Sequence, residues 1–117
     1  MVVSPMPRPD TPRADLLPGT LEMLILRTLH VEPMHGYGIA QHIRKLSREA
    51  LTIEEGSLYP ALQRMLIKGW VTAAWKTSPT KRRTRVYTLT AAGRKELGVQ
   101  QASFNAMFAA LARVMRG

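Results

Sequence analysis

The chain has 117 residues, of which 45% are hydrophobic, and its 17 lysines and arginines outnumber its 8 aspartates and glutamates to give a formal charge of +9. This length supports one modest domain with a single core, and the charge indicates a polyanionic partner, either nucleic acid or an anionic membrane surface. The absence of cysteine excludes a disulfide framework, a thiolate zinc site and a cysteine nucleophile.

Several other kinds of site lack the residues they need. His30, His35 and His42 form no i,i+4 pair and no carboxylate cluster joins them, so we expect no metal site and no cofactor. The chain has no paired carboxylates in a plausible cleft, no glycine-rich phosphate loop and no Ser-His-Asp arrangement, so it is not expected to be an enzyme. No apolar run approaches the roughly 18 residues that span a bilayer, and the N-terminus lacks the layout of a signal peptide, so a cytoplasmic location away from the membrane is expected.

The positive charge is concentrated in one short segment. Residues 71–93 contain five basic side chains and no acidic one, whereas residues 51–70 carry equal numbers of both. The basic residues of the segment are Lys76, Lys81, Arg82, Arg83 and Arg85. The surface that meets the polyanion is therefore expected to be local.

The first elements in chain order are a leader and two short helices. Residues 1–15 are rich in proline and carry no net charge, which predicts a flexible leader. Thr20 is a suitable N-cap for a helix whose apolar residues recur from Leu21 to Leu29, with Pro33 beyond its end. Residues 34–38 predict a turn with two glycines, and the spacing of Ile39, Ile43 and Leu46 predicts a second helix after it.

A third helix is predicted from apolar residues spaced at i, i+4, i+7 and i+8 between Leu58 and Leu66, ending at Gly69. Two signals disagree about its start. Thr52 and Glu55 match a capping box, whereas Pro60 fits best in a first turn, where no backbone donor is required. The boundary stays open by a few residues.

From Trp70 the pattern changes to an alternation that predicts a strand. A turn cluster comes next at residues 77–80, and Arg83 to Leu89 is rich in β-forming residues. The two strands predict a β-hairpin with a basic tip. Thr90 is then a suitable N-cap for a further helix.

One long helix is predicted for the last segment, residues 91–117. Its apolar residues trace a single stripe at spacings of three, four and seven. The stripe consists of Leu97, Phe104, Met107, Phe108, Leu111, Val114 and Met115. It is longer than a core already occupied by three helices and a hairpin can cover, so we expect some of it to meet a second copy of the chain. All seven residues are the predicted candidates for this dimer interface.

Three helices followed by a two-stranded antiparallel hairpin define a mainly α fold, the winged helix-turn-helix, in which the third helix enters the DNA major groove. Ser57, Pro60, Gln63 and Arg64 fall largely on the polar face of that helix. Gln63 suits a bidentate contact to adenine and Arg64 one to guanine. Lys81, Arg82 and Arg83 at the hairpin would neutralise phosphates.

Alternatives remain open at this point. A basic hairpin tip seen alone is more often a solvated loop, and Tyr59 suits core packing as well as a phosphate contact through its hydroxyl. A winged-helix module that binds an acidic partner protein is the second hypothesis. A membrane-surface protein is weaker, because the basic cluster lies on a hairpin and no basic amphipathic helix is evident.

Several motifs together resemble the PadR-like family of bacterial transcriptional regulators. They are Met34-His35-Gly36-Tyr37-Gly38-Ile39, the run from Glu55 to Leu62 with sequence EGSLYPAL, Gly69-Trp70, and the run from Tyr87 to Gly93 with sequence YTLTAAG; residues 16–21 also resemble the first helix of the family. The resemblance extends from about Leu16 to Leu97 and implies a winged helix over residues 16–90 with a dimerisation helix over residues 91–117.

The resemblance also implies a function and a set of DNA contacts. It implies a homodimeric repressor that binds an inverted-repeat operator in double-stranded DNA. The residues it places at or near DNA are Tyr37, Ser57, Tyr59, Pro60 and Gln63, with a wing tip from Lys81 to Arg85. Some compact members bind flat aromatic drugs through a tryptophan on the last helix, but this chain has no tryptophan after Trp75, so a small-molecule effector stays unknown.

Overall fold

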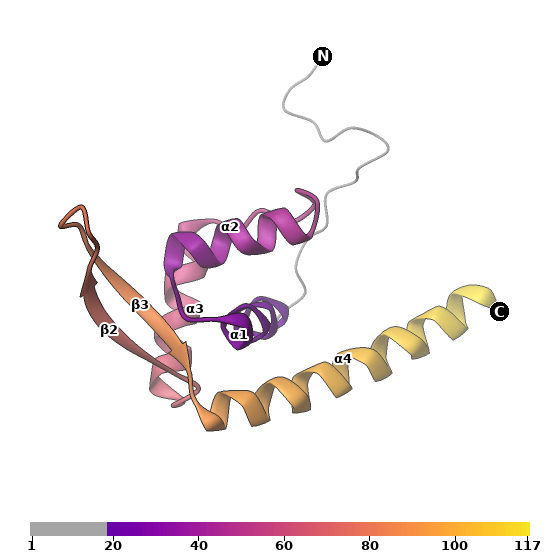
Figure 1. Cartoon of the computed structure of the whole chain (residues 1–117). Coiled ribbons are helices and arrows are strands. Elements are labelled where there is room, and N and C mark those ends of the chain that lie inside the picture. The colour runs from indigo at the N-terminus through magenta and orange to yellow at the C-terminus, as the bar shows by residue number, and fades with distance from the viewer. Residues whose placement is uncertain (1–18) are drawn as a thin grey trace, which may run out of the picture.

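The computed structural model describes residues 19–117 and contains four helices and a small sheet within them (Figure 1). The predicted leader, residues 1–15, lies outside the described residues. The elements in chain order are α1 (Thr20–Val31), β1 (Met34–His35), α2 (Gly36–Leu46), α3 (Glu55–Ile67), β2 (Val71–Thr77), β3 (Arg83–Leu89) and α4 (Ala91–Arg116). The mainly α winged-helix fold expected from the sequence is confirmed.

The start of α1 differs from the prediction by one residue. Gly19, with a φ of 84°, occupies the N-cap position in the left-handed conformation, and no side chain caps the helix. Thr20 is therefore already helical, and its prediction as the N-cap is wrong. A glycine can turn the chain in this conformation at low cost, so the chain enters the helix before Thr20.

The segment predicted as a turn with two glycines forms a strand and the start of a helix instead. Met34 and His35 form β1, which pairs antiparallel with β3, and α2 begins at Gly36. The sheet therefore has three strands in the order β1-β3-β2, where two were predicted. Gly36 allows the Tyr59 ring to approach the backbone closely, because a Cβ there would lie 2.7 Å from the hydroxyl oxygen of Tyr59.

The open boundary of the third helix is resolved at Glu55. Glu54 is the N-cap and makes no side-chain capping bond, so the capping box of Thr52 and Glu55 does not form. Pro60 lies in the second turn and not in the first. Because proline has no N–H, it donates no hydrogen bond to the carbonyl of Gly56, and Gly56 is exposed to water.

The predicted hairpin is confirmed. Strands β2 and β3 pair antiparallel, with Val71 opposite Leu89 and Trp75 opposite Arg85. A tight turn joins them, in which the Lys81 N–H donates to the Ser78 carbonyl at 2.8 Å. We call residues 71–89, the hairpin of β2 and β3, the wing.

One apolar core holds these elements together. Its largest fully buried side chains come from all three short helices and from β2, and they are Ile25, Leu26, Ile39, Leu58, Leu62, Met65 and Val71. The predicted cap of α4 is confirmed, since the Thr90 hydroxyl accepts from the Gly93 N–H at 3.0 Å. The first turns of α4 pack on the core through Leu97, and in Figure 1 the rest of the helix projects away from the body on the side opposite the wing tip.

Candidate nucleic-acid interface

One face of the wing changes from buried to basic along its length. Side chains alternate across a strand, and the register places Val71 and Trp75 on the same face as Arg85 and Tyr87. Near the core this face is buried at Val71 and Tyr87. Nearer the hairpin tip it presents Trp75 and two arginines, so the positive charge faces the same side as the helices.

A groove separates this face of the wing from the start of α2 and the first turns of α3. We call it the interface groove, and its volume is about 740 Å³. It is lined by His35, Gly36, Tyr37, Tyr59, Trp75, Ser78, Thr80, Arg82, Arg83, Thr84, Arg85 and Tyr87. The groove brings together the predicted wing residues Arg82, Arg83 and Arg85 with the predicted helix residues Tyr37 and Tyr59.

The wing charges are free to meet a polyanion. Lys81, Arg82, Arg83 and Arg85 are all exposed, and none of them forms an ion pair within residues 19–117. The Arg83 guanidinium lies 5.0 Å from the centre of the Trp75 ring, and that of Arg85 lies 5.7 Å from the ring of Tyr87. These cation–π contacts hold the two arginines over aromatic faces without neutralising them.

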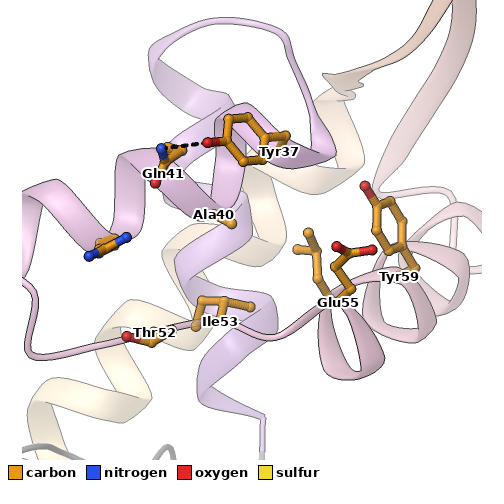
Figure 2. A pocket seen from close by; sticks show the side chains of 9 residues that line it. Tyr37, Ala40, Gln41, Thr52, Ile53, Glu55 and Tyr59 are labelled. Carbon is orange, nitrogen blue, oxygen red and sulfur yellow. Dashed lines mark hydrogen bonds between the residues drawn. The ribbon is translucent and has the colours of Figure 1, made fainter. Parts of the chain in front are cut away.

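Tyr37 projects from the first turn of α2, and its hydroxyl proton has no acceptor within residues 19–117. The Gln41 side-chain amide donates to the Tyr37 hydroxyl oxygen at 2.9 Å (Figure 2). Because that bond uses an oxygen lone pair, the O–H of Tyr37 remains available to donate. The side chain is 68% exposed, so the donor is accessible to a partner in solution.

Tyr59 combines the two roles that the sequence left open. Its ring packs over Gly36, yet the residue is still 43% exposed. Burial, and then the negative charge of Glu55 and the proximity of Tyr87, raise the pKa of Tyr59 above the usual value of 10.0. The hydroxyl is therefore protonated at neutral pH and can act as a hydrogen-bond donor at the edge of the groove.

The exposed face of α3 carries most, but not all, of the predicted base contacts. Ser57, Pro60 and Gln63 are exposed. Arg64 is directed elsewhere, because its Nε donates to Oε2 of Glu22 in α1 at 2.8 Å. The carboxylate of Glu22 is nearly buried and also lies 3.7 Å from the Lys68 amine. We therefore propose that Arg64 serves this ion pair instead of the predicted contact to guanine.

The stripe on α4 divides into a buried start and an exposed remainder. Leu97 is 7% exposed and belongs to the core of its own chain, so it is not available to a second copy, contrary to the prediction from the sequence. The other six stripe residues, Phe104, Met107, Phe108, Leu111, Val114 and Met115, are exposed. The rings of Phe104 and Phe108 stack with their centres 6.1 Å apart.

Among the groove residues that were not predicted from the sequence as DNA contacts, two have side chains suited to a ligand, His35 and Trp75. The sequence marked His35 only as a possible metal ligand and as part of a family motif, and Trp75 only as a strand residue. The hairpin register carried a signal for Trp75, since a residue opposite Arg85 on β2 must share its face. No local pattern marks His35, because β1 becomes a strand only by pairing with β3, far along the chain.

Neither a metal cluster nor a membrane-spanning helix is found in the described part of the chain. Within residues 19–117, no three histidine, aspartate or glutamate side chains come together in a way that could hold a metal ion. Across the same residues, no helix combines the length and apolar character needed to cross a bilayer.

A winged helix with a basic wing facing the start of its third helix is the architecture of a DNA-binding regulator. Residues 25–99 match the model of the PadR-like family of transcriptional regulators. Because that match covers more than half of the chain, the protein belongs to the PadR-like family. Its members are transcriptional regulators and not enzymes.

Solved structures agree with this assignment. A transcriptional regulator from Clostridium thermocellum is 25% identical and superposes with a TM-score of 0.78 over 86% of this chain and 97% of its own. A PadR-like transcription factor from Bacteroides fragilis is 31% identical, with a TM-score of 0.68 over 82% of this chain and 90% of its own.

A sequence relative is also found. An uncharacterized protein X from Lysinibacillus sphaericus is 28% identical over 73% of this chain and 78% of its own.

Proposed function

We propose that the protein is a homodimeric repressor that binds an inverted-repeat operator. The observation that carries this proposal is the interface groove, where exposed wing arginines face Tyr37 and Tyr59 across a gap beside the polar face of α3. Phosphates would enter the groove while α3 lies in the major groove. The repressor role rests on the family resemblance.

The contacts divide into two kinds. Ser57, Pro60 and Gln63 on α3 face base edges, and Gln63 can pair bidentately with adenine. Phosphates meet the hydroxyls of Tyr37 and Tyr59 and the cations of the wing, which are Lys81, Arg82, Arg83 and Arg85. The phosphate contacts fix the position of the protein on the duplex, and the base contacts select the sequence.

The proposed dimer forms through the exposed part of α4. The six apolar side chains from Phe104 to Met115 lie along one stripe and contact water in the single chain, which is unfavourable for a surface of this length. A second α4 packed against the stripe removes it from water. A two-fold dimer then places two copies of α3 in successive major grooves, about 10 base pairs apart.

The test is a titration of the purified protein against duplexes from upstream of its own coding sequence and against duplexes of random sequence, at physiological salt. We expect the upstream DNA to bind at least about a thousandfold more tightly than the random DNA. Equal affinity for both would contradict a sequence-specific regulator. Binding to an acidic protein that persists at high salt, with no binding to DNA, would support the protein-interaction module instead.

A further inference from the structure

The imidazole of His35 has a fixed orientation at the edge of the interface groove. His35 is the last residue of β1 and the N-cap of α2, and its Nδ1 accepts a hydrogen bond from the Gly38 N–H at 3.0 Å. A neutral imidazole has one nitrogen that accepts and one that donates. Because Nδ1 accepts, the proton of the neutral ring is on Nε2.

The Nε2 end of the ring is open. Nδ1 and Cε1 are the ring atoms that lie nearest to Gly38. Within residues 19–117, Nε2 has no hydrogen-bond partner. Every buried side-chain nitrogen or oxygen in that range does have a partner, so Nε2 is not one of the buried atoms. Nε2 is therefore accessible to solvent, and its N–H can donate to a ligand.

The surroundings of the ring indicate what that ligand is. His35 lines the groove together with Arg82, Arg83 and Arg85 of the wing. Its ring also stacks on Tyr37, with ring centres 6.4 Å apart and planes inclined by 24°. The same groove thus holds this donor, Tyr37 and three arginines that form no ion pair within residues 19–117. Together they give the groove a positive potential, which attracts an anionic group.

We propose that His35 binds a DNA phosphate through its Nε2–H while its Nδ1 caps α2. This inference rests on the proposed function, and it adds a contact that carries no charge. A neutral donor holds the backbone in place without releasing a counterion, so it contributes to affinity but not to salt dependence. In this respect His35 differs from the wing arginines.

Two substitutions separate the cap from the phosphate contact. His35→Asn keeps an acceptor near the position of Nδ1, and asparagine is a strong N-cap, but the side chain is too short to replace Nε2–H. His35→Gln extends an amide N–H toward the position of Nε2 but is a poor cap. Both variants lose the stacking on Tyr37. The difference between them therefore separates the effect of losing the Nδ1 cap from the effect of losing the Nε2–H contact.

The measurement is binding of a labelled duplex, recovered from a random pool, and of a random-sequence duplex, over a series of salt concentrations, together with the melting temperature. We expect H35N to melt within a few degrees of the wild type and to bind both duplexes about tenfold more weakly, with an unchanged salt slope. H35Q should melt several degrees lower and bind within about twofold of the wild type.

Two results would overturn the proposal. One is that H35N binds DNA as tightly as the wild type, and the other is that H35N and H35Q lose affinity equally. Failure of the proposed function is distinguishable, because it appears in the wild type as equal affinity for the recovered and random duplexes. If His35 contacts a phosphate, the H35N variant would still bind both duplexes more weakly than the wild type does.

Discussion

At the scale of single residues, the two faces of the wing provide a matched pair of positive charges. Arg83 faces the interface groove over the Trp75 ring. Lys76 is also exposed, but alternation along β2 directs its side chain to the opposite face from Trp75, and it does not line the interface groove. Removing one charge from each face therefore tests which face meets the phosphates.

We predict that Arg83→Ala weakens binding to all DNA sequences alike and reduces the slope of log affinity against log salt by about 1, because one phosphate contact is lost. Lys76→Ala should leave the slope nearly unchanged. Fluorescence anisotropy over a range of salt concentrations measures both. An equal loss of slope in the two variants would show that the groove face makes no more phosphate contacts than the opposite face does.

Neighbouring residues on α3 allow a second matched comparison, of sequence preference. Gln63→Ala should reduce discrimination at one base position by about 1–3 kcal/mol, because an exposed bidentate side chain is removed. Arg64→Ala should leave sequence preference unchanged and lower the free energy of unfolding by about 1 kcal/mol, because its hydrogen bond is to Glu22. Competition with single-base operator variants, and urea denaturation, measure the two effects.

Loss of preference in Arg64→Ala at the same base position as in Gln63→Ala would show that Arg64 leaves Glu22 when DNA binds. The structural ion pair would then be a state of the free protein only. The wild-type and variant proteins can be compared on the same set of duplexes.

At the scale of elements, the spacing of residues along the chain predicted the helices, strands and caps that depend on local sequence alone. The order of the elements, the hairpin and the Thr90 cap follow from alternation, helical spacing and turn chemistry along the chain. The strand β1 is only two residues long, too short to show a pattern, and it exists because β3 pairs with it. The pair of Arg64 with Glu22 joins residues 42 positions apart, so no local signal could assign the direction of that side chain.

The same distinction applies to the candidate site. The charge of the wing and the polar face of α3 were visible in the sequence, because each lies within one element. The groove that joins them depends on how the wing packs against α2 and α3. His35 and Trp75 could therefore be assigned to it only from the structure.

Two glycines of α4 give a prediction at this scale. A Cβ at Gly93 would overlap the carbonyl oxygen of Trp70, whereas a Cβ at Gly98 meets nothing within 4 Å. Gly93→Ala should therefore lower the free energy of unfolding by about 2 kcal/mol or more. Gly98→Ala should raise it by about 0.5–1 kcal/mol, because alanine favours an exposed helix.

Thermal and urea denaturation of the two alanine variants measure this contrast. Gly98 lies away from the apolar stripe, so dimer formation should not change in that variant. A stable Gly93→Ala protein would contradict the close packing between the first turn of α4 and the chain before β2.

At the scale of the whole molecule, we propose that the exposed stripe of α4 determines the oligomeric state. Phe108 lies on the stripe and Ala109 lies on the opposite face of the same helix, and both are exposed in the single chain. We predict that Phe108→Glu produces a folded monomer, because a charge in the proposed interface would be buried without a partner. Ala109→Glu adds the same charge on the free face and should remain dimeric.

Analytical ultracentrifugation over a range of concentrations distinguishes the two variants, and circular dichroism checks that both retain their helices. A wild-type protein that stays monomeric at micromolar concentration would contradict the proposed interface. So would an equal effect of the two substitutions.

We propose that a two-fold dimer places two copies of α3 and two wings on one operator. The most direct measurement is selection of bound duplexes from a random DNA pool by the purified wild-type protein, followed by sequencing. We predict enrichment of an inverted repeat whose half-sites are separated by about 10 base pairs from centre to centre. Recovery of DNA with no enriched motif, or of a single half-site without its repeat, would contradict it.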